Sequence, residues 1–285
     1  MGRRQGDRVR PGGPAVRFAA NISILFKEAA FLERFERARE AGFTAVEFWW
    51  PTGERLDEVV AAVEDAGVQA ILINFDAGDM PSGDRGFVGD VARQHVFRDN
   101  VPVALELARK LGCRQLNALV GHERSAEERE DQLALARENI AWAADQAAAV
   151  DARILIEAVN TFENGPYLLH TTRQAADFIR SVGRPNVKLQ YDAYHMQRME
   201  GNLVATLREH CGHIAHFQAA DSPDRGEPGT GEINYPYVLG ALEQLGYDGW
   251  VGLEYNPTTP TTEESLRWLD RHVRSNGGRV KDLAL

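Results

Sequence analysis

The sequence has little cysteine and no long hydrophobic run. Its two cysteines, Cys113 and Cys211, are too few and too isolated for a disulfide framework or a zinc ribbon. We expect buried free thiols, consistent with a reducing, cytoplasmic compartment. No apolar stretch approaches the roughly 20 residues that span a membrane, which argues against a membrane partner. Residues 1–14 are rich in arginine, glycine and proline but lack the apolar segment of a secretory signal, so we predict a disordered leader there.

Basic residues are outnumbered by acidic ones. The chain has 32 Lys and Arg against 42 Asp and Glu, a net charge of −10. Nucleic acid is therefore a poor candidate partner, because binding its phosphates needs a basic patch. A small anionic substrate needs only local positive charge and stays compatible with this composition. The chain has 285 residues, of which 44% are hydrophobic and 26% charged, as in a soluble globular protein with one large core, alone or as a homo-oligomer.

Short runs of strand-forming residues alternate with longer helical patterns. We predict strands over residues 16–20, 44–49, 69–75, 114–120, 153–158, 187–191, 214–219 and 250–254. Helical patterns follow at 30–41, 55–66, 96–111, 126–149, 173–182, 202–210, 235–245 and 262–273, and Ser125 with Glu128 resembles a capping box before the fourth. Eight such repeats predict an α/β fold, a single-domain (β/α)8 TIM barrel over residues 15–276 with a tail at 277–285.

An open, doubly wound sheet is the alternative fold. It usually has fewer repeats, and it places a glycine-rich phosphate loop after its first strand. No such loop follows residues 16–20 in this sequence. The barrel is therefore favoured, and the sequence offers no site for a nucleotide cofactor.

Each predicted strand delivers a polar residue at its carboxyl end. Parallel barrel strands are otherwise nearly continuous apolar runs, and active sites of barrel enzymes lie at this end. One reading is that these side chains merely cap strand ends; the other is that they form a site. The residues are Asn21, Glu47, Asn74, Asn117, Glu157, Asp192, Gln218 and Glu254.

Three of these residues are carboxylates that favour a metal site. Glu157, Asp192 and Glu254 would repel one another at the barrel mouth unless a cation lay between them. A set of oxygen ligands suits a hard divalent ion such as Mg²⁺ or Mn²⁺ rather than a thiolate zinc site. Alternation along the strand at 214–219 also places His216 on the same inward face as Gln218, one layer deeper.

Two loop residues are further candidates. His195 follows Asp192 by three residues and could contact substrate or simply close the loop. Arg225 lies in a loop with three glycines, where backbone can approach a ligand closely. It could clamp a carboxylate, or form a surface ion pair with Glu227 or Glu232.

Several long segments make the sequence resemble a known family. It is similar to the hydroxypyruvate isomerase family, within the xylose isomerase-like barrel superfamily. The matching segments extend from Arg17 to Trp268 and include RFAANISILF, FTAVEFWWP, ILIEAVN, LQYDAYHMQRMEGNL, HFQAADSPDRGEPGTGEINY and GWVGLEYNP. The fifth strand ends Glu-Ala-Val-Asn where relatives often have proline after the glutamate, and this change leaves Glu157 in place.

The resemblance implies a set of site residues. The metal ligands would be Glu157, Asp192, Gln218 and Glu254, and the two glutamates would also transfer the proton. By similarity to ketose 3-epimerases, His195 and Arg225 would contact substrate oxygens and Glu163 would close the site. Those epimerases commonly have histidine where this chain has Gln218, which favours the isomerase branch.

The resemblance also implies a reaction. We expect a metal-dependent isomerase, using Mg²⁺ or alternatively Mn²⁺ or Co²⁺, that interconverts hydroxypyruvate and tartronate semialdehyde, with Arg225 holding the substrate carboxylate. A 2-oxo-tetronate isomerase, acting on an acid one carbon longer, is the nearest alternative. Phosphodiester cleavage would need a multi-metal, histidine-rich site, and a non-catalytic sugar-acid binding barrel would need no paired glutamates. Fold alone does not separate these functions.

Overall fold

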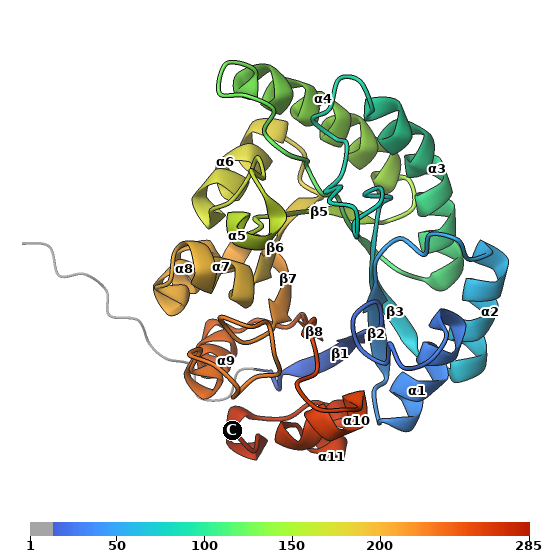
Figure 1. Cartoon of the computed structure of the whole chain (residues 1–285), viewed down its shortest axis with the longest axis vertical. Helices are drawn as coiled ribbons and strands as arrows, with labels where there is room; N and C mark the ends of the chain where they lie inside the picture. Colours follow the sequence, from blue (N-terminus) through green and yellow to red (C-terminus); the bar gives the residue numbers. More distant parts are fainter. Residues whose placement is uncertain (1–13) are drawn as a thin grey trace, which may run out of the picture.

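Eight parallel strands form a closed barrel in the computed structural model, which describes residues 14–285 (Figure 1). Each strand pairs with the next along the chain, and β8 returns to pair with β1 through Arg17 and Trp250. The strands are β1 (Arg17–Asn21), β2 (Ala45–Phe48), β3 (Gln69–Asn74), β4 (Gln115–Asn117), β5 (Arg153–Glu157), β6 (Val187–Asp192), β7 (Ile214–Ala219) and β8 (Trp250–Leu253). This closure confirms the predicted (β/α)8 barrel and rules out the open sheet.

Helices surround the barrel and cover its outer face (Figure 1). The main ones are α1 (Arg34–Glu40), α2 (Leu56–Ala66), α3 (Gln94–Leu111), α4 (Arg129–Ala148), α6 (Thr172–Val182), α8 (Leu203–His210), α9 (Tyr235–Leu245) and α11 (Arg271–Asn276). Shorter helices are α5 (Thr161–Asn164), α7 (Ala193–Met199) and α10 (Thr262–Ser265), with 3₁₀ turns η1 (Phe31–Glu33), η2 (Cys211–His213), η3 (Leu266–Trp268) and η4 (Val280–Asp282). No helix of residues 14–285 is both long and apolar enough to cross a membrane.

Some predicted boundaries were wrong. The single helix predicted at 262–273 is divided into α10, η3 and α11, because Leu269 leaves the helical conformation and Asp270 caps a new helix by accepting from the backbone N–H of His272 at 2.7 Å. The expected capping box is a turn: Ser125 accepts from the N–H of Glu128, and α4 begins only at Arg129.

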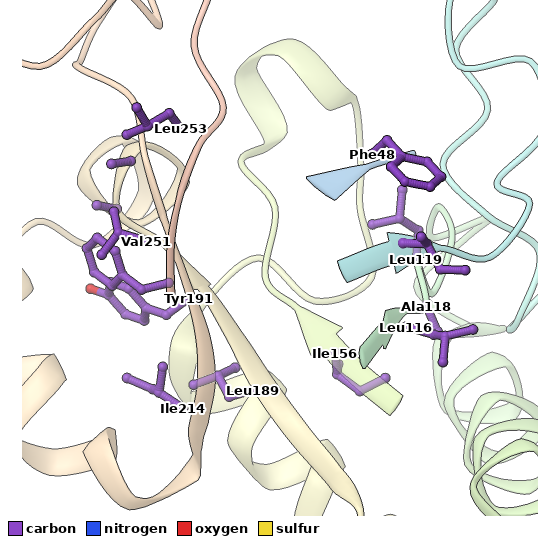
Figure 2. Packing of buried hydrophobic residues seen from close by; sticks show 14 of the residues in the cluster. Phe48, Leu116, Ala118, Leu119, Ile156, Leu189, Tyr191, Ile214, Val251 and Leu253 are labelled. Atoms are coloured by element: carbon purple, nitrogen blue, oxygen red, sulfur yellow. The ribbon is translucent and has the colours of Figure 1, made fainter. Parts of the chain in front are cut away.

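Outward-facing strand residues form the main core against the helices. Figure 2 shows members of this cluster, which are buried and apolar, from β4, β5, β6 and β8. Leu189 and Tyr191 alternate along β6, and Val251 and Leu253 along β8, with the period of two that a strand imposes. Inward-facing residues are thereby left to fill the barrel and, at its carboxyl end, to form a site.

The barrel interior contains a buried pair of a histidine and a glutamate. His216 of β7 lies with its Nε2 atom 2.6 Å from Glu47 Oε2 of β2, and both side chains are inaccessible to solvent. A Cβ atom at Gly252 would overlap the Glu47 carboxylate, so glycine at this position of β8 makes room for the pair. His216 does lie one layer below Gln218, as alternation predicted.

The two ends of the described chain meet beneath the barrel. The N–H of Val16 donates to the carbonyl of Gly278 at 2.9 Å, and Val280 and Leu283 pack against the core. Residues 277–285 thus contact the barrel, while the division of the chain at residues 14 and 276 stays a prediction. Of the predicted leader, residues 1–13 lie outside the described residues. Both cysteines are free, but only Cys113 is fully buried, and Cys211 is half-buried because η2 lies near the surface.

Candidate active site

All eight polar residues predicted at the strand ends are buried. Their exposed fractions range from 0% to 6%. Such burial is costly unless the polar groups are paired or bind a ligand. They are Asn21 and Glu47 from β1 and β2, Asn74 and Asn117 from β3 and β4, Glu157 and Asp192 from β5 and β6, Gln218 from β7, and Glu254, which directly follows β8.

Glu157, Asp192 and His195 form one compact cluster, in which one potential ligand atom of each lies within 4.8 Å of the others. His195 Nε2 is 3.7 Å from Asp192 Oδ2 and 3.9 Å from Glu157 Oε1. Asp192 caps the N-terminus of α7, and its Oδ1 accepts from the N–H groups of Tyr194 and His195. Its Oδ2 is buried and accepts no hydrogen bond within residues 14–285, so this oxygen is available to a cation.

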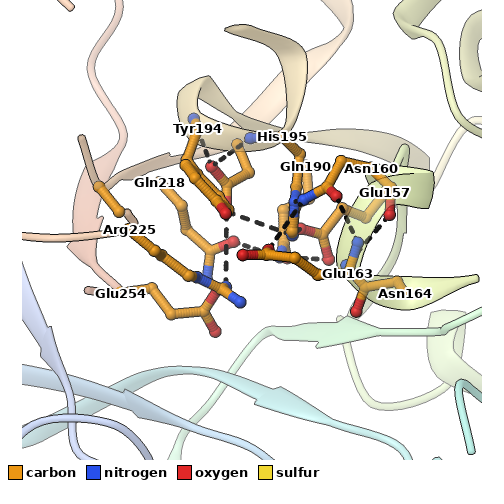
Figure 3. A network of polar contacts seen from close by, with 12 residues as sticks. Glu157, Asn160, Glu163, Asn164, Gln190, Tyr194, His195, Gln218, Arg225 and Glu254 are labelled. Atoms are coloured by element: carbon orange, nitrogen blue, oxygen red, sulfur yellow. Dashed lines mark hydrogen bonds and ion pairs between the residues drawn. The ribbon is translucent and has the colours of Figure 1, made fainter. Parts of the chain in front are cut away.

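Hydrogen bonds define the tautomer of His195. Asn160 Oδ1 accepts from the backbone N–H groups of Phe162 and Glu163, so its Nδ2 faces the imidazole and donates to Nδ1 at 2.7 Å (Figure 3). The pKa of His195 is lowered well below its usual value, mainly by burial and to a smaller extent by the charge of Arg225, so the ring is neutral. The single ring proton therefore lies on Nε2, which makes that atom a hydrogen-bond donor rather than a metal ligand.

Glu254 is held by three neighbours. Its Oε1 accepts from Asn21 Nδ2 at 2.8 Å and from the Trp49 indole at 2.7 Å, and its Oε2 accepts from an Nη2 of Arg225 at 2.6 Å. Arg225 is half-buried in the loop after β7 at a positive φ of 57°, and its carbonyl accepts from the N–H of Asn256. Within residues 14–285 the ion pairs of Arg225 are with Glu254 and Asp192, and not with Glu227 or Glu232, which were the alternative.

Gln218 lies between two residues of the barrel interior. Its Nε2 donates to Glu47 Oε1 at 2.7 Å, and its Oε1 accepts from Gln190 Nε2 at 2.7 Å. Gln190 Nε2 also lies 3.0 Å from Glu157 Oε2, which accepts from Asn117 as well. These contacts position Gln218 and Glu157, two of the predicted metal ligands. Gln218 Oε1 accepts one hydrogen bond and has a second lone pair that could bind a cation.

The cluster of carboxyl groups resists ionisation. Burial, and then Glu254 and Asp192, raise the pKa of Glu157 well above its usual value. Burial raises the pKa of Glu254 to about 7 although Arg225 opposes this, and burial also raises the pKa of Asp192. Without a cation, the site therefore holds protons near neutral pH; a divalent ion would displace them.

This electrostatic arrangement predicts the pH dependence of stability. Between pH 4.5 and about 7 the folded, metal-free protein binds a proton at Glu254 that the unfolded chain releases, so stability should fall as pH rises. Because of Glu254, the free energy of unfolding should fall by about 3 kcal/mol across this pH range. Urea unfolding of chelator-treated protein measures it. In the Glu254→Gln variant the free energy of unfolding should depend less steeply on pH. An unchanged dependence on pH would contradict the conclusion that Glu254 binds this proton.

A small cavity opens beside the carboxylates. Its volume is about 220 Å³, below the roughly 300–1,000 Å³ of sites for drug-sized ligands, so it suits a small substrate. Glu163, predicted to close the site, is exposed and is not among the residues that line the cavity; its Oε2 lies 3.3 Å from Asn160 Nδ2. The cavity is lined by Glu157, His195, Arg225 and Glu254, by the polar residues Asn74, Arg85, Asn117 and Asn164, and by Trp49, Met80, Pro81, Leu119 and Val159.

Comparisons with known proteins agree with this architecture. The family described as xylose isomerase-like TIM barrel matches residues 35–272. A hydroxypyruvate isomerase from Escherichia coli is 44% identical over 90% of this chain and 98% of its own length. A 2-oxo-tetronate isomerase from Cupriavidus necator is 38% identical over 90% of this chain and 98% of its own. The crystal structure of a protein named AP endonuclease, family 2, from Brucella melitensis is 40% identical, covers 89% of this chain and 97% of its own, and has a TM-score of 0.85.

The match to the family extends over most of the described barrel, including β2 to β8 and the whole cluster around Glu157 and Asp192. The relatives named as isomerases are similar along nearly their full length. The chain therefore belongs to the xylose isomerase-like TIM barrel family and is an isomerase.

Proposed function

We propose that the enzyme interconverts hydroxypyruvate and tartronate semialdehyde. The observation that carries this proposal is the pair of buried glutamates, Glu157 and Glu254, which line one small cavity and can therefore act as base and acid on the same substrate. Burial raises the pKa of both carboxyl groups, that of Glu254 to about 7. The similarity to the Escherichia coli hydroxypyruvate isomerase supports the choice of substrate.

The donor set fits a divalent cation. Three buried carboxylates, among them that of Asp192, whose Oδ2 accepts no hydrogen bond within residues 14–285, offer the oxygen ligands that Mg²⁺ prefers and that Mn²⁺ or Co²⁺ could also use. Such an ion would stabilise the negative charge that develops on the substrate oxygens. The proposed ligands are Glu157, Asp192, Gln218 and Glu254.

The protein residues would then move one proton between adjacent carbons. One of the two glutamates removes a proton from C3 of hydroxypyruvate, and a proton is returned to C2, while the hydroxyl proton passes from the C3 oxygen to the C2 oxygen. The Nε2–H of His195 faces this space and donates to a substrate oxygen, and Arg225 contacts a substrate oxygen beside Glu254. Glu163 would close the site. No electrons leave the substrate, so no redox cofactor is required.

The four-carbon acid 2-oxo-tetronate is the second candidate substrate, because a relative of that name is 38% identical over a similar span. Phosphodiester cleavage, suggested by the name of the Brucella melitensis protein, fits less well. Within residues 14–285, the one cluster of potential ligands contains a single histidine, and that histidine presents an N–H. Hydrolytic two-metal sites need a second set of ligands.

Initial rates with the two acids test the proposed substrate. Purified enzyme loaded with Mg²⁺ should show a higher kcat/KM for hydroxypyruvate than for 2-oxo-tetronate, since the cavity is small. A preference for the four-carbon acid would reassign the substrate within the same chemistry. Binding of both acids without turnover by the loaded protein would favour a non-catalytic sugar-acid binding barrel.

A further inference from the structure

Arg85 is a cavity-lining residue to which the sequence assigned no role. It lies in the loop between β3 and α3 and lines the same cavity as Glu157 and Glu254. Backbone contacts fix the loop next to Arg85. The N–H of Gly86 donates to the carbonyl of Ala77 at 2.9 Å, and a Cβ at Gly86 would overlap the backbone of Leu119. The loop therefore packs directly on the chain that follows β4, which limits how far Arg85 can move.

The guanidinium of Arg85 is held by neutral oxygen atoms. Its Nε donates to Asn164 Oδ1 at 2.6 Å, and its Nη1 donates to the carbonyls of Met80 and Asp84 at 2.9 and 2.7 Å. The neighbouring carboxylate of Asp84 pairs with Arg93 at 2.8 Å instead. Within residues 14–285, Arg85 forms no ion pair and its Nη2 donates no hydrogen bond, so no carboxylate contacts its guanidinium.

Arg225 contrasts with Arg85 at the same cavity. Arg225 forms ion pairs with carboxylates: its Nη2 lies 2.6 Å from Glu254 Oε2 and 4.0 Å from Asp192 Oδ2. Burial, and then Arg225, lower the pKa of Arg85, as expected where a second cation lies nearby. Asp84 and Glu163 oppose this lowering only weakly, since neither carboxylate lies within ion-pair distance of Arg85. A half-buried cation beside another cation, without a carboxylate in contact, is an arrangement that an anionic ligand stabilises.

We propose that Arg85 binds the carboxylate of the substrate through its free Nη2 group. This inference rests on the proposed function, which supplies an α-oxo acid as substrate. Leu119, Val159 and Met80 line the same cavity and would exclude water, which strengthens a charge-assisted hydrogen bond. Arg225 then contacts an oxygen at the reacting carbons, and the carboxylate lies toward the loop after β3 rather than against Arg225.

Asn164 and Asn160 link this subsite to His195. Asn164, which accepts from Arg85, donates through Nδ2 to the carbonyl of Asn160 at 3.1 Å, and Asn160 donates to the His195 ring. Two loops thus converge on the substrate, one holding its carboxylate and the other directing an N–H at its reacting oxygens. The substrate is thereby oriented from both ends.

Binding of D-glycerate, an unreactive hydroxy acid, tests the subsite without relying on turnover. Calorimetric titration of Mg²⁺-loaded protein should show that Arg85→Gln raises the Kd for D-glycerate by roughly 30- to 100-fold. Arg85→Lys keeps the charge but loses the planar anchors and should give a smaller rise. The matched control Arg109→Gln removes an exposed arginine of α3 that pairs with Glu106, and should leave the Kd unchanged.

Two further titrations make the result decisive. The Kd for Mg²⁺ should be the same in Arg85→Gln and wild type, which shows that the variant is folded with an intact metal site. Wild-type affinity for D-glycerate in metal-loaded Arg85→Gln would overturn the proposal, and so would wild-type protein that binds D-glycerate no better than glycerol. If hydroxypyruvate is not turned over but D-glycerate binding depends on Arg85, the proposed function fails and the carboxylate subsite stands.

Discussion

Replacing either Glu157 or Glu254 by glutamine should reduce kcat by at least about 10²–10⁴-fold, because a general base contributes this much to proton transfer. Glutamine keeps the size and one oxygen ligand but cannot accept the proton. The hydrogen bonds from Asn117 to Glu157 and from Asn21 to Glu254 can be retained by the amide oxygen, so the fold should be preserved.

Exchange of the substrate C3 proton with solvent deuterium measures this prediction in metal-loaded protein. Both variants should lose exchange together with turnover. The matched control Glu106→Gln changes an exposed glutamate on α3 and should behave as wild type. If one variant retains wild-type exchange and turnover, that glutamate holds the metal only and the two-base mechanism is wrong. Metal content is determined first, and a titration with Mg²⁺ restores occupancy where it is low.

Removal of the divalent metal should abolish turnover, a loss of at least about 10²-fold, because the charge of the ion would then no longer stabilise the negative charge that develops on the substrate oxygens. Burial raises the pKa of Glu157, Asp192 and Glu254, that of Glu254 to about 7, so protons compete with the metal for these carboxyl groups. The glutamates would then be partly protonated and poor bases. Metal loss therefore removes both the charge stabilisation and the base.

Dialysis against a chelator, followed by elemental analysis and rate measurement, tests this dependence. Addition of Mg²⁺, Mn²⁺ or Co²⁺ to the metal-free enzyme should restore activity. Below about pH 7, binding of the metal should release protons, which calorimetric titration with the metal measures. Full activity in protein with no detectable metal would contradict the proposed cofactor. The chelator itself is controlled by adding it together with an excess of Mg²⁺.

The barrel and the polar strand ends could be predicted because each depends on local pattern. A parallel strand covered by helices is apolar along its length, so Glu157 and Asp192 are conspicuous where β5 and β6 end. The closure of the sheet then brings such residues together without further information. Their burial in one network follows from this geometry, while their roles in catalysis stay predictions.

The features that the sequence did not predict depend on contacts between distant segments. The short helices α5 and α7 have four and seven residues, which are too few to show a helical period in the sequence. Their capping residues, Asn160 and Asp192, also belong to the site. The partner of His216 is Glu47 on β2, across the barrel interior. Arg85 is oriented by Asn164 from another loop, which no periodicity reveals.

Isomerisation of hydroxypyruvate by proton transfer is the proposed activity, and proton NMR in deuterium oxide observes it without a coupled assay. With Mg²⁺-loaded enzyme, the C3 signal of hydroxypyruvate should decline while signals of tartronate semialdehyde appear. Deuterium should enter at the carbon that gains the proton, and the same mixture should form from either compound. An unchanged hydroxypyruvate spectrum, with metal bound at the site and the protein folded, would contradict this activity.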